Sequence, residues 1–408
     1  QLTDHGVKCI ILAPTTMGIT NTNRVKTDRK DAANIARCLA FHTYSAVYVP
    51  DGEDNAVKEY LRMRDDQKLF AVVKANAYGH GMIEVAKTAK EAGANGFCVA
   101  IIDEGIELRN AGFDDLVLIL GVCPAEQANA IAANDLSVAV GDLDFLENAK
   151  PLLKAQGLKL KVHLAFDTGM GRIGFVNGEK VHEAEAFMKE NSDQFEFEGI
   201  FTHFACADTK DDSYYKKQLE KFNELKDALD DLPPYVHVAN SAASMWHDDC
   251  GGNAVRYGIT MYGLNPSGRE LELPCEIKPA FSLESELVSV RLLEPGTGIG
   301  YGKTYTVDEP QWIGTVPLGY ADGWLRRMQG FKVLINGEYC QNVGRVCMDQ
   351  FMVKLPYEME KGTKVTLIGE NGGKCITAQD VADYADTIHY EILCSVSERV
   401  PREFIKKY

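Results

Sequence analysis

Eight short apolar segments alternate with amphipathic segments between about residues 69 and 260. The apolar segments have the length and composition of buried strands, and the segments 82–92, 103–111, 125–133 and 213–230 repeat apolar residues at helical spacing. Eight β/α units in about 200 residues predict a (β/α)8 TIM barrel. The expected barrel strands are 69–75, 97–102, 116–121, 136–140, 160–167, 197–204, 236–241 and 254–259.

Polar residues mark the ends of several predicted strands. In a (β/α)8 barrel, catalytic groups gather at the carboxyl ends of the strands. The residues placed there are Lys74, Asp167, His203, Ser241 and Arg256. A lysine at a strand end is ordinarily solvated, but an amine in a dry pocket loses its proton readily and becomes a nucleophile for an aldehyde. Because the other four polar residues are predicted at the same end of the barrel, we favour the interpretation of Lys74 as a nucleophilic amine in a pocket.

The chain changes character after about residue 280. Alternating segments at 287–293, 312–318, 332–335 and 363–367 are separated by Gly, Pro and Asn residues, which is typical of strands joined by turns. We therefore predict a TIM-barrel domain over residues 54–279, a mostly β C-terminal domain over residues 280–408, and an N-terminal extension over residues 1–53.

Composition argues against several classes of protein. The net charge of −16 disfavours nucleic acid as a principal partner. No apolar run reaches the length of a membrane span, and the N-terminus does not resemble a signal peptide. The eleven cysteines are scattered without a CxxC pair, which predicts reduced thiols in a cytoplasmic protein. The sequence shows no spacing typical of metal ligands, so we expect no metal.

The segment 169–174, GMGRIG, fits the GxGxxG pattern of dinucleotide-binding folds. In those folds the third glycine already lies inside the following helix, whereas the next helical segment here begins near Glu179. We therefore favour a loop in which the glycines let Arg172 and the backbone approach a ligand closely.

Nine separated motifs resemble the alanine racemase family in that family's order and approximate spacing. They are AVVKANAYGHG, DTGMGRIGF, THFACAD, NSAA, VRYGITMYGL, GYGKTY, GYADGW, GRVCMDQ and YEIL…RVPR, from about residue 68 to the C-terminus. The resemblance implies a homodimeric enzyme that uses pyridoxal 5'-phosphate to interconvert L- and D-alanine, with D-alanine supplied to the bacterial cell wall. A fold-type III decarboxylase, a single-barrel carrier of the cofactor and a dinucleotide enzyme fit these motifs less well.

The resemblance also implies roles for individual residues, each matched to a motif of this sequence. Lys74 would bond covalently to the cofactor, and Tyr301 of the partner subunit would be the second catalytic base. Arg172 and Met348 would receive the substrate carboxylate. The other residues expected around the cofactor are Tyr78, His203, Ser241, Arg256, Gly258, Ile259 and Tyr390.

The implied chemistry agrees with the residue types. Racemisation removes a proton from one face of Cα and delivers another to the opposite face, which two bases do directly. Tyrosine has a pKa near 10, so Tyr301 needs hydrogen-bonding or cationic neighbours, for which His203 and Arg256 are the candidates. An arginine at the pyridine nitrogen keeps its own proton and leaves the ring a weak electron sink, which favours racemisation over transamination.

Two departures from the family pattern leave alternatives open. Ala165 stands where most relatives carry a lysine, often carbamylated, that positions the arginine of DTGMGR. Arg172 must then be steered by another group, such as an anion or Asp167. A racemase of broader amino-acid or serine specificity therefore remains an alternative, although Tyr390 is the alanine-type residue.

The second departure is the N-terminus. Residues 1 to about 65 resemble a fragment of an IS110-type transposase, whose metal-binding aspartates would correspond to Asp28 and Asp31. Two carboxylates alone make a poor metal site. The family's own first strand is expected to be missing from the β domain, which would leave an unpaired edge. A catalytically impaired fusion protein is the resulting alternative.

Overall fold

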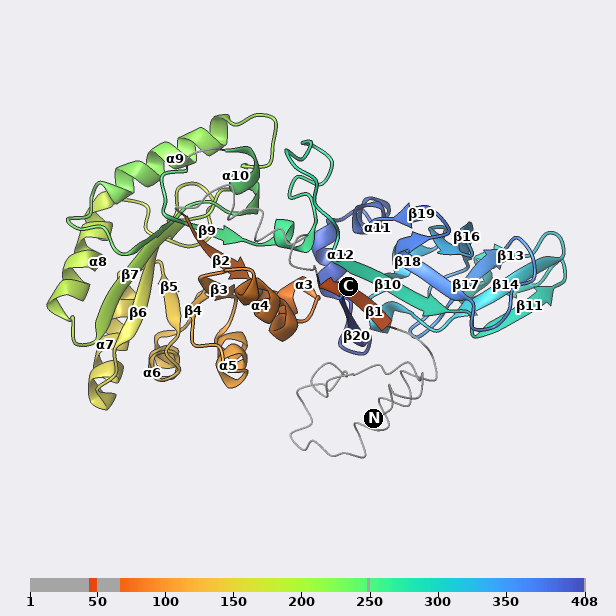
Figure 1. Ribbon diagram of the computed structural model, residues 1–408, viewed down its shortest axis with the longest axis horizontal. Coiled ribbons are helices and arrows are strands. Elements are labelled where there is room, and N and C mark those ends of the chain that lie inside the picture. The colour runs from red at the N-terminus through yellow and green to blue at the C-terminus, as the bar shows by residue number, and fades with distance from the viewer. Residues whose placement is uncertain (1–43, 50–66, 248–249, 407–408) are drawn as a thin grey trace. The chain divides into compact units, whose positions relative to one another are not determined.

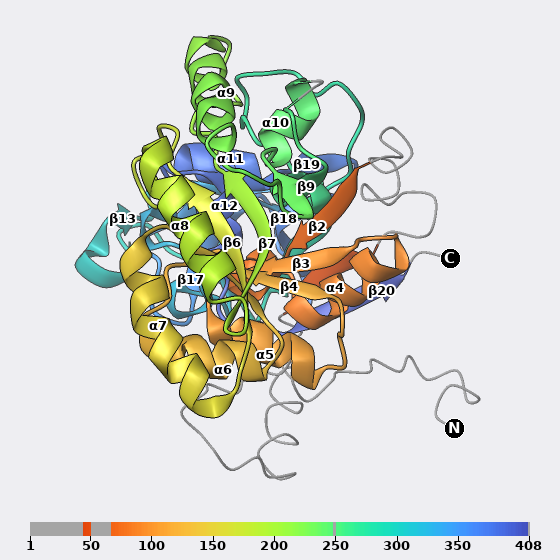
Figure 2. The ribbon, with the colours of Figure 1, turned by 90° about the vertical axis from the view of Figure 1, so that its left-hand side faces the viewer.

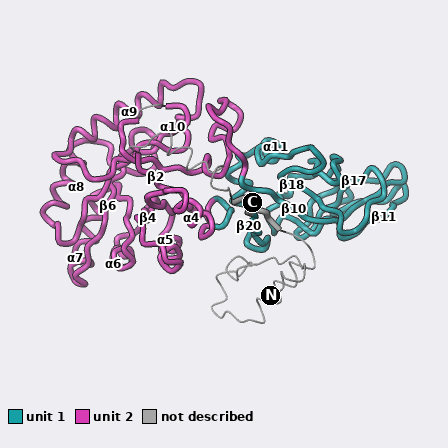
Figure 3. The backbone as a smooth tube through the Cα atoms, in the orientation of Figure 1, with its two compact units in different colours: residues 1–49, 78–81, 280–408 teal, residues 50–77, 82–279 magenta. Residues whose placement is uncertain are grey.

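The computed structural model describes residues 44–49, 67–247 and 250–406. Contacts divide these residues into two compact units (Figure 3). The barrel unit holds the described residues within 50–77 and 82–279, and the β unit holds those within 1–49, 78–81 and 280–408. Within these ranges, no helix is both long and apolar enough to span a membrane.

The barrel unit contains eight parallel strands that form a closed ring, with β2 hydrogen-bonded to both β3 and β9. This confirms the predicted (β/α)8 barrel. The strands read as near-continuous apolar runs because both of their faces are buried. They are β2 (Lys68–Val72), β3 (Gly96–Val99), β4 (Leu116–Ile119), β5 (Ser137–Val140), β6 (Leu160–Phe166), β7 (Phe195–Thr202), β8 (Tyr235–His237) and β9 (Ala254–Tyr257).

Helices cover the outside of these strands, and α5 to α8 follow one another around them (Figures 1 and 2). Asp142 caps α7 by accepting a hydrogen bond from the Phe145 N–H at 2.9 Å, which satisfies a donor that the helix itself leaves open. The helices are α4 (Met82–Glu91), α5 (Ile102–Asn110), α6 (Ala128–Ala133), α7 (Leu143–Gln156), α8 (Gly178–Glu190), α9 (Ser213–Lys226) and α10 (Ser241–Trp246).

The β unit is built on one large sheet, which confirms a mostly β C-terminal domain. Its strand order is β11-β14-β17-β16-β15-β18-β10-β1-β20, where β1 is Tyr44–Val49, and β19 is paired to β18. Neighbouring strands are antiparallel except for β1 and β20. The strands that follow the barrel are β10 (Phe281–Glu286), β11 (Ser289–Leu293), β14 (Gln311–Val316), β15 (Lys332–Ile335), β16 (Glu338–Val343), β17 (Phe351–Leu355), β18 (Lys364–Asn371), β19 (Lys374–Ile376) and β20 (Arg402–Lys406).

Smaller elements complete the β unit. Strands β12 (Gly298–Ile299) and β13 (Tyr305–Thr306) form a separate pair. Helices α11 (Ala378–Tyr384) and α12 (His389–Ser395) follow the sheet. Thr377 and Asp380 form a capping box in which each side chain accepts a hydrogen bond from the other's backbone N–H, and this fixes the start of α11.

Strand β1 (Tyr44–Val49) corrects the prediction of a missing strand. It pairs antiparallel with β10, with Ser45 opposite Leu283, and parallel with β20, with Ser45 opposite Arg402. The segment YSAVYV is rich in aromatic and β-branched residues, which suits it to a strand. The expected unpaired edge is therefore wrong. The predictions for Asp28 and Asp31 fall outside the described residues.

Candidate active site

A cavity of about 260 Å³ opens within the barrel unit at the carboxyl ends of the strands. It brings together four residues predicted from sequence, Lys74, Arg172, His203 and Arg256. Its other lining residues are Ala100, Leu120, Gly121, Val122, Ala165, Phe166, Met170, Ile173 and Phe201. The cavity is thus an apolar bowl with four basic side chains, which suits a small ligand that carries negative charge.

Lys74 stands at the end of β2, where the backbone turns in an unusual direction. The next residues, Ala75, Asn76, Ala77 and Tyr78, all have positive φ between 52° and 53°. Each such residue costs about 1–2 kcal/mol because Cβ crowds the following carbonyl oxygen. Strain of this kind persists only where the surroundings hold it, and it concentrates at functional sites.

Glu104 of α5 holds this left-handed turn. One carboxylate oxygen accepts a hydrogen bond from the Ala75 N–H at 2.6 Å, and the other accepts one from the Ala100 N–H at 2.7 Å. The carboxylate therefore bridges the ends of β2 and β3. Asn76 also stabilises the turn, because its side-chain oxygen accepts a hydrogen bond from the Met82 N–H at 2.8 Å.

We expect Glu104→Ala to lower kcat about tenfold, because the turn that orients Lys74 loses both of its carboxylate bonds and small misplacements of a reacting group are costly. Steady-state kinetics measures kcat, and thermal unfolding checks that the variant remains folded. Asp103→Asn is the matched control, since it removes a charge from the first turn of the same helix at an exposed position. Equal kcat values for the two variants would contradict this role of Glu104.

Arg256 is the most buried cation of the cavity, with 3% of its surface exposed. Its guanidinium donates hydrogen bonds to His237 Nδ1 at 2.9 Å, to Thr202 O at 2.6 Å and to His203 Nδ1 at 3.4 Å. Burial lowers the pKa of Arg256 to about 10, with a smaller contribution from Arg172. The group therefore remains a cation at neutral pH.

His203 is a neutral hydrogen-bond donor at neutral pH. Burial, with smaller contributions from the cations Arg256, Arg172 and Lys74, lowers its pKa to about 3. Because Arg256 donates to Nδ1, the single proton of the neutral ring resides on Nε2.

Asp167 folds the loop that carries Arg172. Its carboxylate accepts hydrogen bonds from the backbone N–H groups of Gly169 and Gly171 at 3.0 Å, and of Arg172 at 3.1 Å. Gly174 has a φ of +130°, and a Cβ there would lie 2.5 Å from the Asp167 nitrogen. The glycines are thus needed for a tight loop. Helix α8 begins at Gly178, so the third glycine of GMGRIG precedes it and the dinucleotide interpretation fails.

Ala165 lies in a small apolar cluster. It is 1% exposed and packs with Ala139 and Phe201, against which Leu120 and Ile173 also pack. Asp167 holds the backbone of Arg172 without any group at position 165.

Two further predicted residues of the barrel unit meet at the ends of β8 and β9. The Gly258 N–H donates to the Ser241 hydroxyl oxygen at 2.8 Å. Ile259 follows Gly258 directly and, like Ser241, is buried. A hydroxyl group beside a backbone N–H at the ends of two barrel strands is a polar pair suited to an anion such as phosphate.

The remaining predicted residues belong to the β unit. Tyr78 and Tyr390 lie together, with ring centroids 6.0 Å apart. Tyr301 is 70% exposed and Met348 is 53% exposed. Both side chains therefore have the accessibility that contact with another molecule requires.

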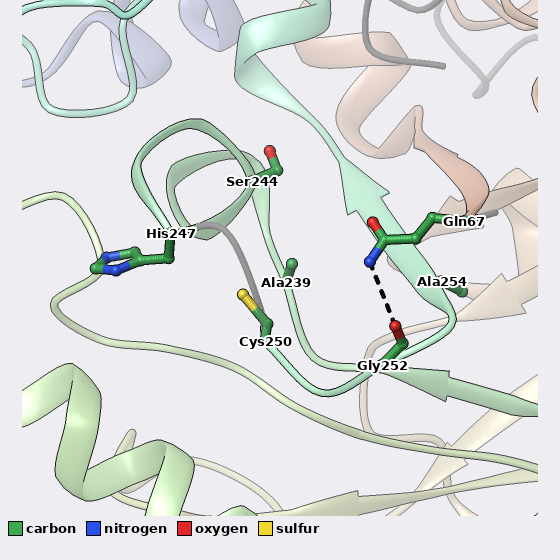
Figure 4. Close-up of a pocket in the computed structure, with 7 residues that line it drawn as sticks. All are labelled: Gln67, Ala239, Ser244, His247, Cys250, Gly252 and Ala254. Atoms are coloured by element: carbon green, nitrogen blue, oxygen red, sulfur yellow. Dashed lines mark hydrogen bonds between the residues drawn. The ribbon is translucent and has the colours of Figure 1, made fainter. Parts of the chain in front are cut away.

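A second, much smaller hollow lies in the barrel unit (Figure 4). Its volume is about 10 Å³, and the Gln67 side chain donates to Gly252 O across it at 3.3 Å. It is lined by Gln67, Ala239, Ser244, His247, Cys250, Gly252 and Ala254. This space holds about one water molecule, so it is no alternative site for a cofactor or substrate.

Sequence reasoning missed four polar residues around the cavity: Glu104, His163, Glu198 and His237. His163 and His237 are fully buried and Glu198 is 9% exposed. The available signal was a polar residue inside an apolar strand segment, as in KVHLAF and YVHVAN.

Two family profiles match the chain. The profile described as "Alanine racemase, N-terminal domain" matches residues 54–266, and "Alanine racemase, C-terminal domain" matches residues 280–404. An alanine racemase of Ligilactobacillus salivarius is 63% identical over 348 residues, covering 85% of this chain and 94% of the relative. An alanine racemase of Lactiplantibacillus plantarum is 52% identical over 89% of this chain and 98% of the relative.

Solved structures agree with these sequence matches. The crystal structure of alanine racemase from E. faecalis has a TM-score of 0.86 and 49% identity, covering 89% of this chain and 98% of that one. A histidine racemase from Leuconostoc mesenteroides has a TM-score of 0.83 and 31% identity, covering 90% of this chain and 98% of that one.

Proposed function

Because the chain belongs to the alanine racemase family, we propose that it interconverts L- and D-alanine with pyridoxal 5'-phosphate, the cofactor of this family. The observation that carries the proposal is the convergence of Lys74, Arg172, His203 and Arg256 on one cavity at the ends of the barrel strands.

The residues of the barrel unit fit the cofactor. A strand-end amine, a buried guanidinium and a hydroxyl group beside backbone N–H groups supply partners for an aldehyde, a ring nitrogen and a phosphate, respectively. When bound, the cofactor withdraws electrons from the substrate and makes its Cα proton acidic. Lys74, His203, Ser241, Arg256, Gly258 and Ile259 would hold it, together with Tyr78 and Tyr390 of the β unit.

Two bases on opposite faces of the substrate complete the chemistry. The Lys74 amine takes or gives the Cα proton on one face, and Tyr301 of the partner subunit does so on the other. The 70% exposure of Tyr301 supports a homodimer with shared sites, because a residue that serves a second subunit must be accessible on its own chain. Arg172 and Met348 receive the substrate carboxylate.

Arg256 limits the reaction to racemisation. With a pKa of about 10 it keeps its protons at neutral pH, so it would donate a hydrogen bond to the ring nitrogen of the cofactor without transferring a proton. By leaving that nitrogen unprotonated, Arg256 would weaken the electron withdrawal that the cofactor supplies and favour return of the proton to Cα.

The setting proposed for this enzyme is the cytoplasm. The nine cysteines of the described ranges are all free thiols, which suits a reducing compartment.

We expect D-alanine to form from L-alanine when the purified protein is supplied with pyridoxal 5'-phosphate, and chiral chromatography measures it. L-serine and L-histidine are the comparison substrates, because a racemase of broader specificity remains the alternative. We expect the highest kcat/KM for alanine. A protein that binds the cofactor and racemises serine or histidine faster than alanine would overturn the proposed substrate.

A further inference from the structure

A row of buried polar side chains continues from Arg256 into the interior of the barrel. Arg256 Nη1 lies 2.9 Å from His237 Nδ1, and His237 Nε2 lies 2.7 Å from His163 Nδ1. His163 Nε2 lies 2.9 Å from Glu198 Oε2. We call Arg256, His237, His163 and Glu198 the barrel relay. The row runs from the cavity toward the amino ends of the strands, where Ser137, the first residue of β5, also donates to Glu198 Oε2.

The barrel is shaped to seat this row. The register between β6 and β7 shifts between Val162 and His163, because their partners Phe197 and Gly199 leave Glu198 as an extra residue of β7, which is a bulge. Opposite it stands Gly199, where a Cβ would lie 2.2 Å from His163 Nδ1. Any larger residue at position 199 would displace the imidazole, so the space for the His163 ring depends on this glycine.

The two end residues of the barrel relay, Arg256 and Glu198, fix the direction in which its hydrogen bonds are donated. Arginine donates and never accepts, whereas an ionised carboxylate accepts and never donates. An imidazole that is neutral has one donor and one acceptor. With both rings in that form, one arrangement satisfies every bond: His237 and His163 both accept at Nδ1 and both carry their proton on Nε2.

The charges around the relay support this arrangement. Burial by itself raises the pKa of Glu198, but hydrogen bonds from His163 and Ser137 and the charge of Lys161 hold it below its ordinary value. Burial, together with His163 and Arg256, holds the pKa of His237 well below its ordinary value. A carboxylate and a guanidinium thus face each other through two imidazoles, in an interior where such bonds strengthen one another.

We propose that Glu198 and His163 are positioning residues for the racemase reaction. They fix the tautomer of His237 and, through it, the orientation of the Arg256 guanidinium toward His203 and the cofactor ring. This inference rests on the proposed function, because that function places Arg256 at the cofactor.

Glu198→Gln tests the proposal with little change of shape. The amide can donate as well as accept, so the relay can reverse and set a His237 Nδ1–H against the Arg256 N–H. We expect kcat for L-alanine to fall about tenfold, KM to stay within twofold, and the affinity of the cofactor-free protein for pyridoxal 5'-phosphate to fall. Kinetics and fluorescence titration measure these quantities.

Glu185→Gln is the matched control. Glu185 is 1% exposed and accepts hydrogen bonds from the backbone N–H groups of Asp230 at 2.8 Å and Asp231 at 3.1 Å, away from the cavity. We expect it to lower the melting temperature and to leave kcat and cofactor affinity within twofold. If the two variants match in kcat and cofactor affinity, the barrel relay is merely structural and the proposal is overturned.

Two substitutions at His163 test whether a conservative replacement preserves activity. Glutamine can accept from His237 and donate to Glu198, so His163→Gln keeps the direction of the relay, whereas His163→Leu interrupts it. We expect His163→Gln to retain several-fold more activity than His163→Leu. Equal losses in two folded variants would contradict the proposal.

Nitrogen-15 NMR of the histidine-labelled, cofactor-free protein separates this inference from the proposed function. We expect His237 to carry its proton on Nε2 in the parent and to show Nδ1 protonation in Glu198→Gln. A His237 signal that Glu198→Gln leaves unchanged would overturn the relay even in an active enzyme. The expected tautomer change in a protein that does not racemise alanine would support the relay and reject the proposed function alone.

Discussion

Lys74→Ala is expected to lower the rate of D-alanine formation by at least about 10³-fold. The variant lacks the amine that we propose both holds the cofactor and moves a proton at one face of Cα, and a positioned acid or base alone is worth about 10²–10⁴-fold. Chiral chromatography of the product measures the loss. The visible absorbance of the bound cofactor should also change, because the proposed covalent bond to Lys74 can no longer form.

Lys68→Ala is the matched control for this experiment. Lys68 is the first residue of β2, the strand that leads to Lys74; it is exposed and lies over the Tyr235 ring at 4.9 Å. Lys68→Ala should retain full activity, which would show that loss of a lysine near this strand is harmless in itself. Substantial turnover by Lys74→Ala would remove Lys74 from the mechanism.

Tyr301→Phe is expected to lower kcat in both directions by about 10²–10⁴-fold, because the phenol is the proposed proton donor and acceptor at the second face. The melting temperature should not change, since the side chain is 70% exposed on its own chain. Tyr339→Phe is the matched control, because Tyr339 of β16 is another exposed tyrosine of the same unit. Wild-type kcat in Tyr301→Phe would contradict the two-base mechanism.

Mixing the two variants tests whether sites are shared between subunits. In a dimer of one Lys74→Ala chain and one Tyr301→Phe chain, one site carries both changes and the other carries neither. Random co-assembly should therefore restore about a quarter of the wild-type activity, since half of the dimers are mixed. An inactive mixture that contains the mixed dimer would show that Lys74 and Tyr301 act within one chain.

The barrel could be predicted from sequence because its strands are buried on both faces and stand out as apolar runs. The cavity followed because parallel strands bring their carboxyl ends to one rim, where Lys74, His203 and Arg256 stand. Helices α11 and α12 escaped prediction because each has only seven residues, too few for a clear helical period.

Other contacts depend on register, which a single sequence does not reveal. Glu104 reaches Ala75 because β2 and β3 are adjacent, and the carboxylate of Glu198 reaches His163 because a bulge shifts β6 against β7. β1 was assigned to the extension because its surroundings resemble another family, and its partners β10 and β20 lie hundreds of residues away.

The position of β1 has a consequence for the order of events during synthesis. It sits between β10 and β20, and both of these strands follow all the barrel strands along the chain. Every barrel strand is therefore synthesised before the sheet of the β unit can close. β1, the first described strand along the chain, pairs with β20, the last one. The sheet therefore depends on contacts of very high sequence separation, which form slowly. Until then β1 and β10 present open strand edges to other chains, and chaperones that bind such edges would be most useful in that interval.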